Sequence, residues 1–186
     1  MNKRKEDKIA GLETLDYLKR NRYERTMRFL KRHVAVNESI IDLGTPNPLS
    51  DIMIKNGYKV VNTSGEDLDT EFSRIAGYKG DVTTSFEVFE HLLAPFNILR
   101  EIKTQKLIAS VPLKLWFTSA YWNEDSEWDR HYHEFEKKQF DWLLEKSGWK
   151  IIDSESWTAP IRAVGIKPLL RLVTKRYYIV MCERSR

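Results

Sequence analysis

The sequence predicts an α/β fold: a three-layer sandwich around a mostly parallel sheet. Two observations predict it. Short apolar runs alternate along the chain with segments whose apolar residues recur every three or four positions, and the connections between them are short. The 186 residues, 41% of them hydrophobic, suit a single domain. We expect a helical cap over residues 1–35 and an α/β core over residues 36–186.

An amphipathic segment opens the chain. Apolar residues from Leu12 to Leu30 recur at helical spacing, which predicts one broken helix or two consecutive helices. This region holds a good part of the positive excess, which is +4 for the whole chain. Its Lys and Arg residues alternate with apolar ones, and no nucleic-acid-binding motif accompanies them. We interpret them as a solvated helix face, with binding of nucleic acid as the weaker alternative.

A strand, a helix and a second strand are predicted within residues 39–63. Ser39 to Gly44 is a short apolar run that ends in glycine, which is typical of a buried strand entering a turn. Asn47 and Pro48 then favour a helix start, because they supply a capping side chain and a pre-set φ angle. That helix is expected to end at Gly57, before a second strand over residues 58–63.

Further elements follow in the same alternation. The predicted strands are Val82–Phe86, Lys106–Val111, Trp149–Trp157 and Arg176–Glu183, and the predicted helices begin near Pro95 and span Glu134–Ser147. Two long stretches, 113–133 and 158–175, are expected to be irregular and to form walls over one site. In open sheets of this kind ligands bind at the carboxyl ends of the strands, so we expect the site there.

Composition excludes several classes of protein. A single cysteine, Cys182, cannot form an intramolecular disulfide, and the first residues lack the apolar run of a secretory signal. No stretch approaches the roughly 18 apolar residues that a membrane-spanning helix requires. We therefore expect a cytoplasmic protein without a membrane span.

Three segments, in order, resemble the motifs of the class I S-adenosylmethionine-dependent methyltransferases: Ile40–Gly44, Asp81–Leu92 and Lys106–Pro112. The most specific part is Ser-Phe-Glu-Val-Phe-Glu-His-Leu at 85–92, which is similar to the branch that methylates small molecules, lipids and glycans. The resemblance implies a Rossmann-like methyltransferase fold with an antiparallel last strand and S-adenosylmethionine as cofactor. It also implies methyl transfer to a small-molecule or glycan-like acceptor, with oxygen as the expected methylated atom.

The same resemblance implies a cofactor site at the strand ends. Asp42, Gly44 and Thr45 would flank the amino-acid end of the donor. The backbone at 86–88 would face its adenosine or methionine portion, through Phe86, Glu87 and Val88. Ser64 and Glu66 stand where the ribose would lie; for Glu66 the alternative is a solvated turn.

Glu90, His91 and His131 are the catalytic candidates. Glu90 and His91 follow a strand end, and an imidazole titrates near neutral pH, so His91 would orient the acceptor or act as a base. The alternative for His91 is a hydrogen-bonded scaffold residue. Trp122 and His133 are the acceptor-binding candidates; the alternative is a lid that packs on the fold, with His133 and the residue after it capping the next helix. His131 and His133 lack a third ligand at a convincing spacing, so no metal is expected.

Departures from the family pattern lead to a second hypothesis. Pro46 and Pro48 stand where the family has a glycine-rich turn, and proline removes backbone donors. Asn62 stands near the position of the usual acid after the second strand. The 17 residues from Ser64 to Gly80 are too few for a helix, a strand and a helix, so the third strand is expected to be reduced or missing. The alternative function is a catalytically degenerate binding or scaffold protein.

Overall fold

The computed structural model describes residues 8–161 and 165–185. Their six strands form one sheet in the order β2-β1-β3-β4-β6-β5. The strands are β1 Ser39–Asp42, β2 Lys59–Asn62, β3 Val82–Phe86, β4 Lys106–Pro112, β5 Trp149–Thr158 and β6 Lys175–Arg184. Only β6 runs antiparallel to its neighbours. The predicted mostly parallel sheet with an antiparallel last strand is confirmed.

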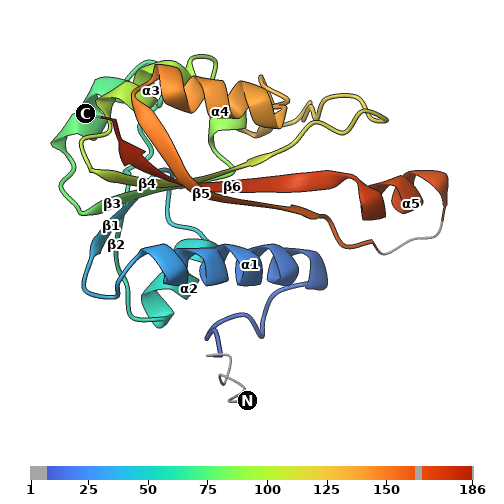
Figure 1. Cartoon of the computed structure of the whole chain (residues 1–186), viewed down its shortest axis with the longest axis horizontal. Coiled ribbons are helices and arrows are strands. Elements are labelled where there is room, and N and C mark those ends of the chain that lie inside the picture. The colour runs from blue at the N-terminus through green and yellow to red at the C-terminus, as the bar shows by residue number, and fades with distance from the viewer. Residues whose placement is uncertain (1–7, 162–164, 186) are drawn as a thin grey trace.

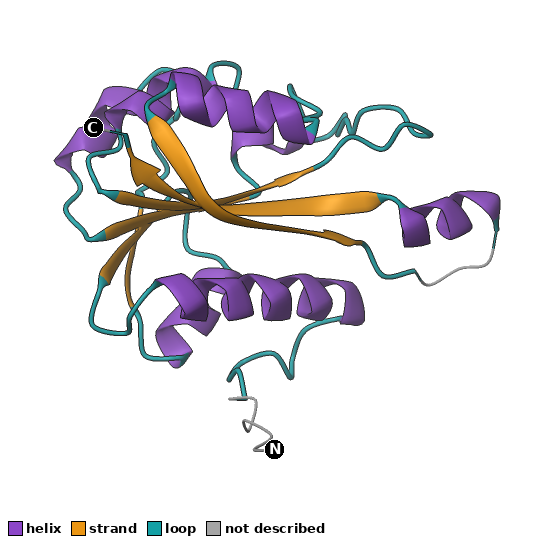
Figure 2. Cartoon of the chain, viewed as in Figure 1, coloured by secondary structure: helices purple, strands orange, loops and turns teal. Residues whose placement is uncertain are grey.

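Four helices of the described chain lie on the two faces of this sheet, and the fifth, α5, lies beyond the ends of β5 and β6 (Figures 1 and 2). They are α1 Tyr17–His33, α2 Pro48–Lys55, α3 Pro95–Glu101, α4 Lys137–Lys146 and α5 Ile166–Val173. Helices α1 and α2 cover one face, where Met27, Phe29 and Leu30 pack in one core with the apolar side chains of α2 and β1. Helices α3 and α4 cover the other face, over a second core that contains Phe140 and Trp149. The three-layer arrangement is confirmed.

The third strand of the family pattern is missing from the described chain. Between Asn62 and Val82 the structure has a 3-10 helix, η1 Phe72–Gly77, and no strand. As a result β2 forms the edge of the sheet, and its side chains are half-buried or exposed. The short connection at residues 64–80 therefore removes a strand from the edge without changing the strands in the centre.

The N-terminal region holds one helix within the described residues, not two. Asp16 caps α1 by accepting hydrogen bonds from the N–H groups of Leu18 and Lys19, at 2.9 and 3.3 Å. A capping side chain of this kind fixes where a helix begins. Leu12 lies before the cap and is buried without being helical. The helical spacing that begins at Leu12 was therefore wrong as a predictor of the helix start.

Two expectations for the loops also need correction. The stretch 158–175 is not wholly irregular, because it contains α5. The apolar side chains of α5, at Ile166, Leu169, Leu172 and Val173, are exposed. The helix has only eight residues and contains Pro168, which favours a loop, although its apolar residues recur at helical spacing. Helix α4 begins at Lys137 and is capped by Glu136 with Gln139, rather than by the residues at 133–134.

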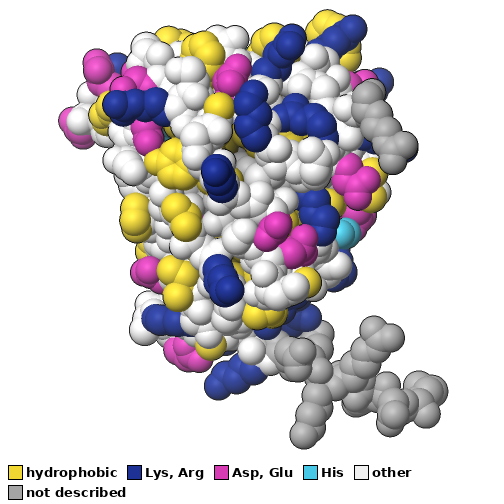
Figure 3. Space-filling view, turned by 90° about the vertical axis from the view of Figure 1, so that its left-hand side faces the viewer, with side chains coloured by type: hydrophobic (Ala, Val, Ile, Leu, Met, Phe, Trp, Pro, Cys, Tyr) yellow, Lys and Arg dark blue, Asp and Glu magenta, His cyan; other side chains and the backbone are white. Residues whose placement is uncertain are grey.

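The surface of the described residues shows two further features. No helix among them has both the length and the apolar character needed to cross a membrane. Figure 3 views the end of the sheet away from α5, where Lys and Arg side chains are interspersed with Asp, Glu and apolar ones. The positive excess therefore does not form a single basic patch on this face.

Candidate active site

A cavity of about 540 Å³ lies at the carboxyl ends of β1, β3 and β4, where the sequence predicts a site. Its floor comes from the chain just after β1, from the turn after β3, and from Ser110 and Pro112 of β4. Helix α1 adds Arg22, Tyr23 and Thr26 to the wall. The cavity thus lies between the first helix and the three central strands.

Asp42 ends β1 and is almost fully buried, with 2% exposure. Its carboxylate accepts hydrogen bonds from the Thr84 hydroxyl at 2.6 Å and from the Asn62 amide at 3.0 Å. Burial raises the pKa of Asp42 to about 6, although the bonds from Thr84 and Asn62 act in the opposite direction. Asn62 also donates to the carbonyl of Gly44 at 3.3 Å, so its side chain fastens the turn after β1.

Gly44 leaves open space at the turn after β1. Its φ is +109°, a conformation that favours glycine, and an added Cβ would meet only Val88 Cγ2, at 4.0 Å. The Gly44 N–H is already donated to Thr63 Oγ1, at 2.8 Å. Thr45 and Asn47 line the cavity beside it, and Asn47 caps α2 by accepting from Leu49 and Ser50. The predicted helix start at 47–48 is confirmed.

Ser64 and Glu66 do not line this cavity. One oxygen of Glu66 accepts a hydrogen bond from the Tyr78 hydroxyl at 2.6 Å, and the other accepts from the Ser64 N–H at 2.7 Å. The bond from Tyr78 is the main reason that the pKa of Glu66 is lowered. Both side chains therefore close the turn after β2, which is the alternative that the sequence left open for Glu66.

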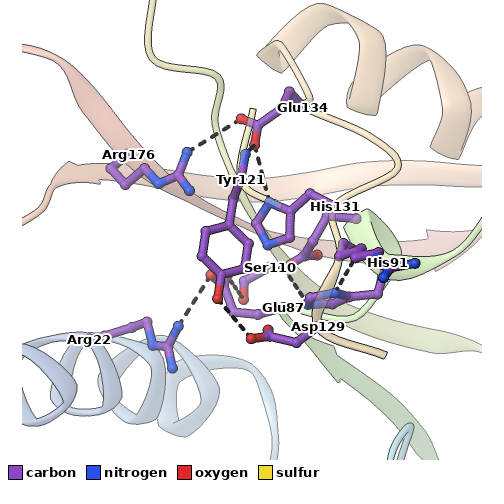
Figure 4. A network of polar contacts seen from close by, with 11 residues as sticks. Arg22, Glu87, His91, Ser110, Tyr121, Asp129, His131, Glu134 and Arg176 are labelled. Carbon is purple, nitrogen blue, oxygen red and sulfur yellow. Dashed lines mark hydrogen bonds and ion pairs between the residues drawn. The ribbon is translucent and has the colours of Figure 1, made fainter. Parts of the chain in front are cut away.

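Phe86, Glu87 and Val88 all line the cavity after β3. Glu87 has a φ of +57°, which is uncommon for a residue with a side chain. Its carboxylate accepts from the Ser110 hydroxyl at 2.8 Å and forms an ion pair with Arg22 at 3.3 Å (Figure 4). These contacts hold the carboxylate at the cavity wall.

The sequence suggested that Arg22 lies on a solvated helix face, and this was wrong. Its side chain is 26% exposed and lines the cavity opposite β3. Burial by itself would lower the pKa of Arg22, but the charge of Glu87 together with contacts to Tyr177 and Tyr23 outweighs it, and the pKa is raised. The guanidinium is therefore a fixed positive charge within the site.

Glu90, His91 and His131 come together at one side of the cavity. Glu90 is buried to 1% exposure, and burial, followed by the charge of Glu87, raises its pKa well above its ordinary value. The imidazole rings of His91 and His131 pack edge to face, with their centroids 4.8 Å apart. Burial lowers the pKa of His131, which keeps that imidazole neutral.

The long loop after β4 is fastened to the site by backbone and side-chain contacts. The N–H groups of Tyr132 and His133 both donate to the carbonyl of Glu90, at 2.8 and 3.1 Å. Glu134 binds His131 through one carboxylate oxygen and Arg176 through the other (Figure 4). This wall is therefore built around the backbone and the neighbours of Glu90.

Trp122 and His133 lie outside the main cavity. The ring of His133 stacks on Phe135 at 5.3 Å, and its Nε2 lies 3.3 Å from the carbonyl of Leu93. Trp122 lines a second cavity of about 480 Å³. The two cavities share the residues Tyr121, Arg176 and Tyr177, so they adjoin each other.

Several residues of the main cavity were not predicted as site residues from the sequence: Arg22, Ser110, Tyr121, Asp129, Arg176 and Tyr177. Ser110 lies near the carboxyl end of one predicted strand, and Tyr177 lies near the amino end of another. These positions could have indicated that both residues lie at the site. Tyr121 donates its hydroxyl to Asp129 at 2.7 Å. That pair lies within one irregular loop, where the sequence has no periodicity to indicate which side chains face inward.

No family model and no curated protein sequence matches the chain. Solved structures share its fold. The methyltransferase partner of the Trm112 activator from Haloferax volcanii has a TM-score of 0.57 and 12% identity, over 89% of this chain and 92% of that one. A protein from Bacillus halodurans C-125, described as a methyltransferase, has a TM-score of 0.58 and 11% identity, over 87% and 97% of the two chains.

Magnesium protoporphyrin IX methyltransferase from Synechocystis PCC 6803, solved with bound S-adenosylhomocysteine, has a TM-score of 0.54 and 11% identity, over 89% and 82%. The chain has the class I methyltransferase fold. At this level of identity the likeness concerns the fold alone. Within the methyltransferase fold, the main cavity of this chain lies at the end of the sheet where open α/β folds bind their ligands.

Proposed function

We propose that the protein is an S-adenosylmethionine-dependent methyltransferase that acts on a hydroxyl oxygen of a small-molecule or glycan-like acceptor. The observation that carries the proposal is that one cavity joins the open turn at Gly44 to the polar cluster of Glu87, Glu90, His91 and His131. A methyl transfer needs both parts, because the protein must hold the donor and orient the acceptor in line with it.

The residues at the ends of β1 and β3 fit the donor. The open space at Gly44 allows close approach to the backbone, and Asp42 and Thr45 flank it. The apolar side chains of Phe86 and Val88 face the same space. When bound, S-adenosylmethionine supplies an electrophilic methyl group on a sulfonium, and the electrons of the broken C–S bond stay on sulfur.

The acceptor side is the wall formed by the long loop and β6. The adjoining cavity, with Trp122 and the shared Tyr121, offers aromatic faces of the kind that pack against a sugar or another polar ring. Both cavities fall within the range of roughly 300–1,000 Å³ that is typical of small-molecule sites. We therefore propose that the acceptor enters through the second cavity and places its oxygen at Glu90, His91 and His131.

Features of the β2 end favour a second candidate, a degenerate binding or scaffold protein. The side chain of Asn62 is hydrogen-bonded to Asp42 and Gly44, and that of Glu66 is hydrogen-bonded to Tyr78 and Ser64. No carboxylate from residues 62–80 lines the main cavity. A donor in this cavity would lack a carboxylate partner for its ribose hydroxyls on that side, which weakens binding relative to a complete site.

Calorimetric titration with S-adenosylhomocysteine separates the two candidates. The enzyme hypothesis expects saturable binding of one ligand per chain, and release of S-adenosylhomocysteine from S-adenosylmethionine when a polyol, a sugar or a phenol is supplied. Absence of binding at millimolar ligand would leave only the scaffold hypothesis. Methyl transfer to amines but not to hydroxyls would overturn the choice of oxygen, and transfer to an RNA or DNA oligomer would overturn the acceptor class. The proposal includes a reducing, cytoplasmic setting, because the sole cysteine is a buried thiol.

A further inference from the structure

Three side chains in the main cavity could hold one metal ion. Glu90, His91 and His131 each offer one ligand atom, and these atoms lie within 4.8 Å of one another. His91 Nε2 lies 3.7 Å from Glu90 Oε1. Two ligands of one ion lie about 3–4 Å apart when each metal–ligand bond is about 2.0–2.1 Å, so this pair already has a suitable spacing. The remaining ligand atoms come within the same spacing after only a small shift of the side chains.

The hydrogen bonds of the two imidazoles determine which ring nitrogen carries the hydrogen. His91 Nδ1 lies 3.0 Å from the carbonyl oxygen of Arg130, which can only accept. His131 Nδ1 lies 3.2 Å from the carboxylate of Glu134, which also accepts. Each neutral ring therefore has its hydrogen on Nδ1 and an unprotonated lone pair on Nε2. Metal-binding histidines show this arrangement, with the other ring N–H donated to a carbonyl or a carboxylate.

Glu90 has an oxygen without a partner. Its Oε2 is buried and accepts no hydrogen bond within the described residues. The other oxygen, at 3.7 Å from His91 Nε2, is too far away for a hydrogen bond. A buried polar atom without a partner costs about 1–3 kcal/mol, so such an atom in a folded chain requires an explanation. A cation at this point supplies the missing partner.

The cluster cannot satisfy itself by internal hydrogen bonds alone. Both Nε2 atoms are acceptors, and a protonated Glu90 has one hydrogen to share between them. At least one Nε2 lone pair then remains without a donor among these three residues. A cation removes this conflict for all three residues at once.

We propose that Glu90, His91 and His131 bind a divalent first-row transition cation. Two imidazole nitrogens with one carboxylate oxygen suit Mn²⁺, Fe²⁺, Co²⁺ or Zn²⁺ better than Ca²⁺ or Mg²⁺, which favour oxygen ligands. Since these three residues supply only three ligands, positions on the ion remain open toward the cavity. From the sequence we expected no metal, because His131 was considered together with His133. In the structure His133 contacts Leu93 instead, and the ring of His131 packs against that of His91.

The open positions define what the cation does in the site. A hydroxyl oxygen of the acceptor binds there, and coordination lowers its pKa. With a cation held there, the carboxylate of Glu87, which lines the same cavity, would take the hydroxyl proton, and the oxygen would form its bond to the methyl carbon as the C–S bond breaks and its electrons stay on sulfur. This role rests on the proposed methyl transfer, whereas binding of the cation does not.

Cation binding is tested on the full-length chain without a histidine tag, after treatment with a chelator and dialysis. Titration with Co²⁺ and with Zn²⁺ is followed by calorimetry, and Co²⁺ also by its visible absorption bands. We expect one ion per chain. The variants His91→Ala, His131→Ala and Glu90→Gln should lose binding. The other two histidines provide matched controls: His133→Ala should keep binding, and so should His33→Ala, since His33 lies on α1 and pairs with Asp153 of β5.

A milder variant tests the site in case the alanine variants fail to fold. Glu134→Gln keeps the shape of the residue that orients His131, and loss of such a partner weakens metal affinity by about 10- to 100-fold. Circular dichroism checks each variant. Absence of Co²⁺ and Zn²⁺ binding, or equal loss in His133→Ala and His131→Ala, overturns the proposal. S-adenosylhomocysteine is titrated into the same samples: if it binds and the cations do not, only the cation site fails, and the reverse result refutes the methyl transfer alone.

Discussion

The guanidinium of Arg22 lies 3.3 Å from the carboxylate of Glu87, which joins α1 to the turn after β3 across the main cavity. The two residues are 65 positions apart in the sequence. Both side chains are mostly buried, so neither charge is fully hydrated if its partner is removed. The pair therefore fixes the position of the first helix relative to the candidate site.

We expect Arg22→Gln to lower the free energy of unfolding by about 1–3 kcal/mol, because it leaves the Glu87 carboxylate with the Ser110 hydroxyl as its remaining side-chain donor. Urea unfolding measures the loss, and Arg20→Gln, at an exposed position of the same helix, is the control. In a double-mutant cycle with Glu87→Gln, the two losses should not add. Additive losses would mean that the two side chains do not interact.

Asp42 should make stability depend on pH. Its pKa is raised by burial to about 6 in the folded chain, against about 3.9 when unfolded. Between these values the folded state keeps a proton that the unfolded state has lost, so stability falls as pH rises. Above about pH 6 the full penalty is about 3 kcal/mol. We therefore compare the free energy of unfolding of Asp42→Asn with that of the natural chain at two pH values. The difference should be more favourable to Asp42→Asn at pH 7 than at pH 4.

Urea unfolding at several pH values checks this expectation. Asp51→Asn, at an exposed position on α2, is the matched control for the loss of a carboxylate. A difference between Asp42→Asn and the natural chain that stays constant from pH 4 to pH 7 would contradict the raised pKa.

Gly44→Ala separates ligand binding from backbone strain. The added Cβ meets no atom closer than 4.0 Å, so the chain should still fold, with a loss of about 1–2 kcal/mol for the positive φ. The methyl group stands where the donor is proposed to approach, and we expect affinity for S-adenosylhomocysteine to fall by about tenfold or more. Gly148→Ala, at a φ of +92° outside the cavity, should show the strain alone. Equal affinities in the two variants would exclude Gly44 from the ligand site.

Cys182 should be inert in the folded protein. It is fully buried in β6, and burial raises the pKa of its thiol to about 12. Since the thiolate is the reactive form, alkylation near pH 8 should be slower than in the unfolded chain by about a thousandfold or more. Mass spectrometry after iodoacetamide treatment, with and without denaturant, measures the fraction of chains that carry the single possible cysteine modification. Rapid labelling of the native chain would show that β6 opens locally.

The fold could largely be predicted from the sequence because its strands are marked locally. Val82–Phe86 begins with three β-branched residues, which favour a strand, and Asn47 with Pro48 marks a helix start by side-chain chemistry alone. Helix α5 was not predicted, because it has only eight residues and contains Pro168, which favours a loop. The start of α1 was misplaced because Leu12 is buried without being helical.

The site could be predicted only in part. Asp42, Glu87 and His91 follow strand ends, and strand ends were visible in the sequence. The contacts that give these residues their chemistry come from elsewhere in the chain. Arg22 reaches Glu87 from the first helix, and His131 reaches His91 from an irregular loop. Such contacts depend on tertiary packing, for which a single sequence holds no local signal.

The shortened sheet has a consequence for turnover. None of the residues from 64 to 80 lines the main cavity, and Tyr78 with Glu66 closes that segment on itself. A ligand that leaves past β2 therefore has no contacts with this segment to break. Differences in affinity between related sites are mostly differences in dissociation rate. Under the proposed function, product should leave quickly, so product formation should start without a burst and its rate should be set by the chemical step.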